Sequence, residues 1–394
     1  MFVGNGIDNH PALDQALKGK RLGLITNGSA VDRTLKPTLD ILHEKYHLTK
    51  LFNTIYGVRT EFIYGERVLH YTDMPTGLPV ESIFHRECNG PTEEMLQDLD
   101  AVVFDMKEAG CRYYEYLYCL ANAMRACAKA KMPFIVLDRI APINGVDVEG
   151  VVCPSEMHTM VGDYGLPNRI GLTIGEFAQY INNEFHIGCD LEVVPNVGWR
   201  RGQYYDETGL PWILPSPNLP HTTANLLYAG MCLFEGISNI NEGRGTSKPF
   251  ELIGAPWLNA AELAKRMNEK KLDGVAFGNI FYIPVSSKHA KEICHGLQIH
   301  VLDRKTFQPV RMALTLIEEI RKLHPDTLEW AGATAGHDVK QPDSPVQFDY
   351  YFDKLLGTSD FRKGVYTADQ LLELHRPKVE QYRTSKCKYH LYEE

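Results

Sequence analysis

Five short apolar runs mark the first half of the chain. They span residues 21–26, 50–55, 101–106, 133–138 and 191–195. Runs that are apolar throughout are typical of strands buried on both faces, as in a parallel sheet. Ligands of such sheets bind beyond the carboxyl ends of the strands. Asn27, Asp105 and Asp138 stand at these ends, so we expect them near a binding edge. Turn chemistry alone also favours Asn and Asp at strand exits, and this alternative stays open.

Segments with helical spacing of apolar residues lie between these runs. They are residues 34–46, 113–130 and 173–185. Alternation of buried strands and helices predicts an α/β domain with a mostly parallel sheet. After residue 222 the pattern changes to helical segments and alternating strands, which indicates a mixed α+β domain. These segments are residues 222–232, 259–271, 275–285, 296–303, 309–324 and 371–382. We therefore place one domain at residues 1–215 and a smaller one at residues 216–394.

A polar, glycine-punctuated stretch, residues 233–257, follows the first helix of the second domain. It contains Glu235, Glu242, Glu251 and Arg244. Long polar loops inside compact proteins are usually functional or disordered, and the apolar residues that follow, such as Phe250, argue against disorder. We interpret the stretch as a rigid loop that places carboxylates and a guanidinium in a cleft. The alternative is a structural crossover whose charges pair with each other.

The bulk composition excludes several classes of protein. The 394 residues carry a net charge of −9 without a prominent Lys/Arg run, so a nucleic-acid partner is not expected. The apolar runs are too short to span a membrane. The first twenty residues lack the features of a secretion signal, which favours the cytoplasm unless a signal was removed before residue 1. Zinc-type spacings, a GxGxxG fingerprint and a phosphate-binding P-loop are all absent, so we expect neither a metal nor a cofactor.

After these exclusions, the candidates for catalysis are acidic residues near the predicted strand ends and in the polar loop. They are Asp105, Glu108, Asp138, Glu149, Glu176, Glu235 and Glu242. Glycoside hydrolysis needs little more than two carboxyl groups on either side of the scissile bond, one of them protonated. The pattern therefore permits a glycosidase but does not select the pair.

Several segments together resemble one family, a former domain of unknown function linked to exo-acting β-N-acetylmuramidases. They are GKRLGLITNGSAVD (19–32), GLPVESIF (77–84), DMKEAGCRYYEY (105–116), VLDRIAPINGVDVEG (136–150), GLTIGEFAQYIN (171–182), the long block 215–257 and the closing YHLY (389–392). The resemblance implies a Rossmann-like first domain, a smaller α+β second domain and a cleft between them. It also implies release of terminal N-acetylmuramic acid from peptidoglycan fragments without metal or nucleotide.

The sequence departs from this family at two motifs. After the second strand the family typically reads F-x-P-E-H-G-x-R-G, and its glutamate is the favoured catalytic residue. Here Ile55 and Tyr56 stand at the glutamate and histidine positions. The family's R-H-G-M-T also loses its histidine, which is replaced by Ile170. An isoleucine side chain neither donates nor accepts a proton, so the usual catalytic glutamate is missing.

We predict the site residues from the acids and from the positions that match the family. The catalytic candidates are Glu242, Asp105 and Tyr56, because tyrosine is the nucleophile of some glycosidases. The candidates for substrate binding are Asn27, Arg59, Arg112, Tyr114, Asp138, Glu176, Asn218, Glu235 and Arg244. Arg112 and Arg244 would bind the lactyl carboxylate of a muramic acid or muropeptide. A protein that binds such a sugar without cleaving it, and a glycosidase of altered specificity, stay open as alternatives.

Overall fold

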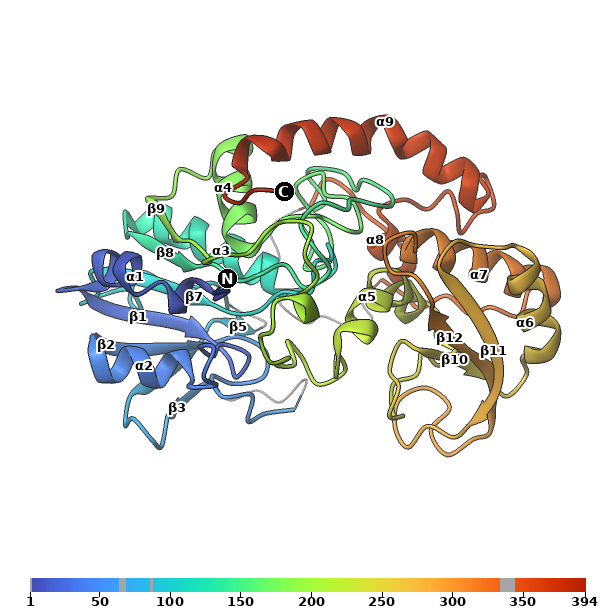
Figure 1. Ribbon diagram of the computed structural model, residues 1–394, viewed down its shortest axis with the longest axis horizontal. Helices are drawn as coiled ribbons and strands as arrows, with labels where there is room; N and C mark the ends of the chain where they lie inside the picture. The colour runs from blue at the N-terminus through green and yellow to red at the C-terminus, as the bar shows by residue number, and fades with distance from the viewer. Residues whose placement is uncertain (1, 64–68, 86–87, 334–343) are drawn as a thin grey trace.

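The computed structural model of the protein describes residues 2–63, 69–85, 88–333 and 344–394 (Figure 1). The larger sheet of this described part has seven strands in the order β3-β4-β2-β1-β7-β8-β9. All neighbours run parallel except the edge pair β3 and β4. The strands are β1 (Arg21–Thr26), β2 (His47–Asn53), β3 (His70–Thr72), β4 (Pro79–Ser82), β7 (Ala101–Asp105), β8 (Phe134–Leu137) and β9 (Leu191–Val194). A separate short hairpin is formed by β5 (Phe84–His85) and β6 (Cys88–Asn89).

Alternate residues of each central strand point to opposite faces of the sheet, and both faces are covered. Along β7, Ala101 and Val103 pack into the cluster that contains Leu13 and Leu39, from the helices α1 (His10–Leu17) and α2 (Thr38–Lys45). Phe104 belongs to the other cluster, together with residues of α3 (Tyr116–Ala130) and α4 (Ile174–Glu184). Burial on both sides explains why these strands are apolar throughout.

The second sheet is small and antiparallel, in the order β10-β12-β11. Its strands are β10 (Leu252–Ala255), β11 (Val275–Tyr282) and β12 (Cys294–Val301). The accompanying helices are α5 (Thr222–Met231), α6 (Ala260–Glu269), α7 (Pro309–Leu323), α8 (Tyr351–Leu356) and α9 (Ala368–Lys386). Short 3-10 helices are η1 (Gly6–Asp8), η2 (Tyr205–Glu207), η3 (Cys232–Gly236) and η4 (Cys387–Tyr389).

One apolar cluster joins the two halves. It contains Phe104 of the large sheet, Leu227 of α5, Leu316 of α7 and Leu371 of α9. In Figure 1, α9 crosses from the small sheet back to the large one, and α5 lies between them. The Tyr382 hydroxyl of α9 donates to the Ile170 carbonyl at 2.9 Å. The last residues of the chain therefore return to the first sheet.

The predicted α/β architecture is confirmed, with a mostly parallel sheet followed by a smaller α+β part. The structure also contains elements that the sequence analysis did not predict, mainly α1, the edge strands β3 and β4, and β10. The last of these lies inside the stretch 233–257, which we expected to be a loop. The partner strand β12 lies so close to β10 that a Cβ atom on Gly296 would be only 2.1 Å from the Ile253 carbonyl oxygen. The division at residue 215 stays a prediction. None of the described helices is long and apolar enough to cross a membrane.

Candidate active site

The acidic residues of the stretch 233–257 converge on one arginine. Arg244 Nη2 donates to Glu235 Oε1 at 2.5 Å, and Arg244 Nε lies 3.2 Å from Glu242 Oε1. The other Glu242 oxygen accepts from Lys288 Nζ at 2.9 Å. These four residues, Glu235, Glu242, Arg244 and Lys288, are called the acidic cluster below. It holds two carboxylates and two cations in direct contact.

Local backbone geometry fixes this cluster. The Asn241 side chain accepts from the Gly243 amide at 2.8 Å, and the Phe250 amide donates to the Glu242 carbonyl at 2.8 Å. Gly243 has a φ of 85°, and a Cβ atom there would lie 2.6 Å from the Lys248 carbonyl oxygen. Glycine is therefore required for the turn that brings Glu242 and Arg244 together.

The two acids differ in their access to solvent. The Glu242 side chain is 1% exposed, whereas that of Glu235 is 21% exposed. Burial acts against the charged form of Arg244, but the neighbouring Glu235 and Glu242 outweigh it and raise the pKa of Arg244 above its usual value. The guanidinium also lies 5.1 Å from the centre of the Phe250 ring. Arg244 is thus a cation held between the partly exposed carboxylate of Glu235 and the buried carboxylate of Glu242.

Aromatic residues of the first half pack toward the acidic cluster. The Tyr114 ring lies 6.1 Å from the Tyr228 ring, which lies 5.0 Å from Phe250, the ring beside Arg244. Tyr56 is half-buried, and burial, followed by the charge of Glu115, raises its pKa, while Arg244 lowers it. The predicted residues Tyr56, Tyr114, Glu235, Glu242 and Arg244 are therefore brought into one region.

Asp105 lies in a different ion pair. It is fully buried, and Arg139 Nη2 donates to its Oδ2 at 2.7 Å. The same oxygen accepts from the Thr38 hydroxyl at 2.6 Å. Asn27, at the end of the adjacent strand, accepts from the Ser29 hydroxyl at 2.6 Å. The contacts of Asp105 join the ends of β7 and β8 to α2, and the catalytic role of Asp105 stays a prediction.

Four other predicted residues have structural partners. Arg59 is paired with Asp40 and Asp73. Arg112 is fully buried and donates to backbone carbonyls, among them that of Val151 at 2.8 Å. Asp138 accepts from the Thr173 hydroxyl at 2.8 Å and from Tyr392, and burial raises its pKa to about 7. Glu176 is paired with Arg201 and accepts from the Leu391 amide at 2.9 Å. Asn218 is a half-buried turn residue. Binding roles for these residues stay predictions.

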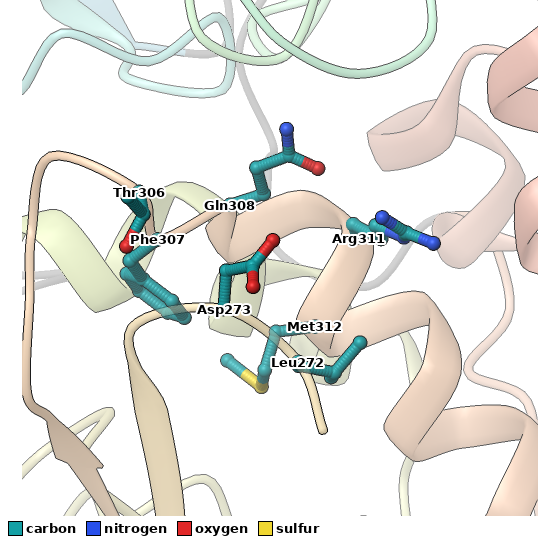
Figure 2. Close-up of a pocket in the computed structure, with 7 residues that line it drawn as sticks. All are labelled: Leu272, Asp273, Thr306, Phe307, Gln308, Arg311 and Met312. Carbon is teal, nitrogen blue, oxygen red and sulfur yellow. The ribbon is translucent and has the colours of Figure 1, made fainter. Parts of the chain in front are cut away.

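A small cavity lies at the start of α7, apart from the predicted residues. Figure 2 shows the side chains around it, and its volume is about 10 Å³, roughly the space of one water molecule. It is lined by Leu272, Asp273, Thr306, Phe307, Gln308, Arg311 and Met312. A cavity of this size does not accept a sugar ring. In the described part of the chain, no three His, Cys, Asp or Glu side chains are grouped as ligands for a metal ion.

Two residues of this region were missed by the sequence reasoning. Lys288 lies in the connection between β11 and β12, where no motif distinguishes it from other surface lysines. Glu115 directly precedes α3, within the segment 105–116 that carries the family resemblance, and the run of tyrosines around it was the available signal. Both enter the region through tertiary contacts.

The chain matches two family models that together span most of its length. "Exo-beta-N-acetylmuramidase NamZ, N-terminal" matches residues 22–223, and "Exo-beta-N-acetylmuramidase NamZ, C-terminal" matches residues 226–392. The chain belongs to the NamZ family. The family suggested by the sequence motifs is therefore confirmed.

Relatives of known sequence or structure agree with this membership. The peptidoglycan β-N-acetylmuramidase NamZ of Bacillus subtilis (strain 168) is 38% identical over 396 residues, which cover 99% of this chain and 91% of that protein. A crystal structure of a DUF1343 family protein from Bacteroides fragilis NCTC 9343 has a TM-score of 0.86 and 31% identity, with 99% of each chain covered. A second DUF1343 structure from that organism has a TM-score of 0.75 and 26% identity, with 100% of each chain covered.

Proposed function

We propose that this protein is a glycosidase that removes terminal N-acetylmuramic acid from peptidoglycan fragments. The observation that carries the proposal is similarity along the whole chain to the Bacillus subtilis peptidoglycan β-N-acetylmuramidase. Both NamZ models match, so the similarity includes each half of the molecule. The acidic cluster supports the proposal chemically, because it combines two carboxylates with cations suited to an anionic sugar.

Within the acidic cluster the residues suit different tasks. Glu235 is the more exposed acid, so a substrate reaches it more readily than the buried Glu242. Arg244 presents a guanidinium that suits the lactyl carboxylate of muramic acid, since arginine and carboxylate form paired hydrogen bonds. Glu242 holds Arg244 and Lys288 in place and keeps its predicted role as a catalytic acid. Glu242 and Asp105 are both buried and paired with cations, and the location of Glu242 beside Arg244, which also holds the more exposed Glu235, favours Glu242.

A muropeptide-binding protein without glycosidase activity is the second candidate. The specific observation in its favour is Ile55, which stands at the family's glutamate position, is 8% exposed and packs in the apolar core. Loss of a general acid or base typically lowers the rate by about 10²–10⁴-fold. On this alternative the same cluster binds the sugar acid, but the glycosidic bond stays intact.

Release of N-acetylmuramic acid distinguishes the two candidates. The wild-type protein is incubated with a chromogenic β-N-acetylmuramide and with muropeptides, and the assay is repeated with Glu242→Gln. The control is Glu269→Gln, an exposed glutamate at the end of α6. Release that Glu242→Gln abolishes and Glu269→Gln preserves supports the glycosidase. Calorimetric binding without release supports the binding protein, and absence of both binding and release contradicts both candidates.

A further inference from the structure

Lys288 enters the acidic cluster from outside the stretch that supplies the other three members. It lies in the connection of residues 283–293 between β11 and β12. Most side chains of this connection are exposed, and Pro284, Lys288 and His289 are the ones that are buried or half-buried. The Lys288 side chain is 21% exposed. A lysine in such a connection usually extends its charge into water, so its inward orientation needs a cause.

Two hydrogen bonds of the Lys288 ammonium group provide that cause. Nζ donates to Glu242 Oε2 at 2.9 Å and to the Phe234 carbonyl at 2.9 Å. Because Phe234 directly precedes Glu235 in η3, this cation joins the Glu242 carboxyl group to the backbone that carries the other acid. Arg244 makes a second connection between the two acids, since it contacts Oε1 of each. The Glu242 carboxyl group is therefore held at both of its oxygens.

The backbone around Lys288 is attached to the same stretch. Asn241 Nδ2 donates to the Lys288 carbonyl at 2.9 Å and to the Arg244 carbonyl at 3.0 Å. The Val285 amide donates to the Gly245 carbonyl at 2.8 Å. Asn241 thus fixes the backbones of the two cations of the acidic cluster relative to each other.

The residues on either side of Lys288 have an unfavourable backbone conformation. Ser287 and His289 have φ values of 71° and 57°. Residues other than glycine rarely adopt such left-handed values, which persist where the surroundings hold them and which are found most often at functional sites. His289 Nε2 donates to the Asn239 carbonyl at 2.9 Å, and this contact helps to hold the strained backbone. The local conformation therefore depends on the contacts that place Lys288 in the acidic cluster.

We propose that Lys288 is a positioning residue that holds Glu242 in the orientation needed for cleavage. The inference rests on the glycosidase function proposed above and on the predicted catalytic role of Glu242. With Lys288 at Oε2 and Arg244 at Oε1, the carboxyl group is oriented before a sugar binds, and such preorganisation lowers the barrier of the chemical step. Lys288 acts through Glu242, so its loss should slow cleavage without weakening the binding of the sugar.

The test is steady-state kinetics of wild type, Lys288→Met and Lys288→Arg with a chromogenic β-N-acetylmuramide. Methionine is unbranched like lysine but has no charge, whereas arginine keeps a charged donor. We expect Lys288→Met to lower kcat and kcat/KM equally, by about 100-fold, as for the loss of an interaction that acts on the transition state. Lys288→Arg should recover part of the rate.

The matched control is Lys291→Met, which removes the same charge from an exposed lysine of the same connection and should keep the kcat and KM of wild type. Urea unfolding checks that each variant is folded. If Lys288→Met is unfolded, Lys288→Gln, which keeps an uncharged donor, is judged by the same criteria.

Four results would contradict the inference. A variant of Lys288 that raises KM alone would show that Lys288 binds the substrate itself, and an unchanged kcat would show that Glu242 needs no help from it. A loss that Lys288→Arg does not reduce at all would show that a cation at position 288 is not what matters. Release by Glu242→Gln at the wild-type rate would remove the roles of Glu242 and Lys288 but leave the glycosidase. A wild type that releases no N-acetylmuramic acid overturns the glycosidase itself and this inference with it.

Discussion

The Arg139 guanidinium holds the Asp105 carboxylate with two hydrogen bonds, one from Nε to Oδ1 and one from Nη2 to Oδ2. Both side chains are almost completely buried. Asp105 ends β7 and Arg139 follows β8, so the pair joins two neighbouring strands of the large sheet where they leave it. A buried ion pair of this kind is a structural element whose loss on one side leaves an uncompensated charge.

Replacement of Asp105 by Asn should therefore destabilise the fold. We expect the free energy of unfolding to fall by about 3–5 kcal/mol, because Arg139 would stay buried without its counter-charge. Urea unfolding followed by circular dichroism measures this, with the exposed Asp98→Asn as control. A variant of wild-type stability that has lost all muramide cleavage would instead assign Asp105 a catalytic role.

Replacement of Arg244 by Lys should weaken recognition of the sugar acid. Lysine keeps the positive charge but lacks the planar guanidinium group that donates to Glu235 and also lies beside the carboxylate of Glu242. We expect kcat/KM on a muramide to fall by about 10–100-fold, mainly through KM, since hydrogen bonds to charged groups contribute about 1.5–3 kcal/mol. Steady-state kinetics with and without the lactyl group on the substrate tests this. An equal loss on both substrates would show that Arg244 does not bind the lactyl carboxylate.

The stability of the protein should fall as pH rises toward 8, in part because of Glu108. Burial raises the pKa of Glu108 to about 8 from a usual value of 4.5. Between these values the folded state keeps a proton that the unfolded state releases, so unfolding becomes easier with rising pH, by up to about 1.4 kcal/mol per pH unit for one proton.

The variant Glu108→Gln cannot release this proton, and its stability should depend less steeply on pH. Urea unfolding at pH 5 and pH 8 compares the variant with wild type, and Glu94→Gln serves as the exposed control. Identical pH dependence of wild type and Glu108→Gln would mean that Glu108 ionises in the folded protein as readily as in the unfolded chain.

Introduction of Glu at position 55 should not raise the activity. Ile55 packs in the apolar core, so Ile55→Glu would bury a carboxyl group and lower the free energy of unfolding, more at pH 8 than at pH 5. Ile55→Leu is the control for packing alone. Muramide release and urea unfolding are measured together. A rise in release above wild type would show that the missing glutamate limits this protein.

The architecture was predictable because the buried strands consist mostly of apolar residues, which the sequence shows directly. The runs AVVF of β7 and FIVL of β8 have no polar residue to place on a solvent face, and both strands have a neighbour on each side in the large sheet. Strand β10 was missed, since its four residues lie among glycines and charges that indicate a loop. The edge strand β3, HYT, is largely exposed and has too little apolar character to be recognised.

The site was predictable only in part. Glu235, Glu242 and Arg244 are close in sequence, so their convergence follows from one short loop. The sequence does not distinguish Asp105 from Glu242 as acids, because their partners Arg139 and Lys288 come from distant segments. Glu115 had only the tyrosines around it as a signal in the sequence, because the packing of Tyr114, Tyr228 and Phe250 that brings this segment toward Arg244 depends on the completed fold. Patterns along the chain report burial, whereas ion-pair partners depend on the completed fold.

The return of the chain end to the large sheet has a consequence for biosynthesis. Tyr392 donates to Asp138, and the Leu391 amide donates to Glu176, so two buried acids of the first half receive partners from residues about 200 or more positions later. A ribosome releases the strands of that sheet long before it adds these partners. Until translation reaches Leu391 and Tyr392, Glu176 and Asp138 lack these hydrogen-bond partners, so this part of the polar interior of the first half is completed late.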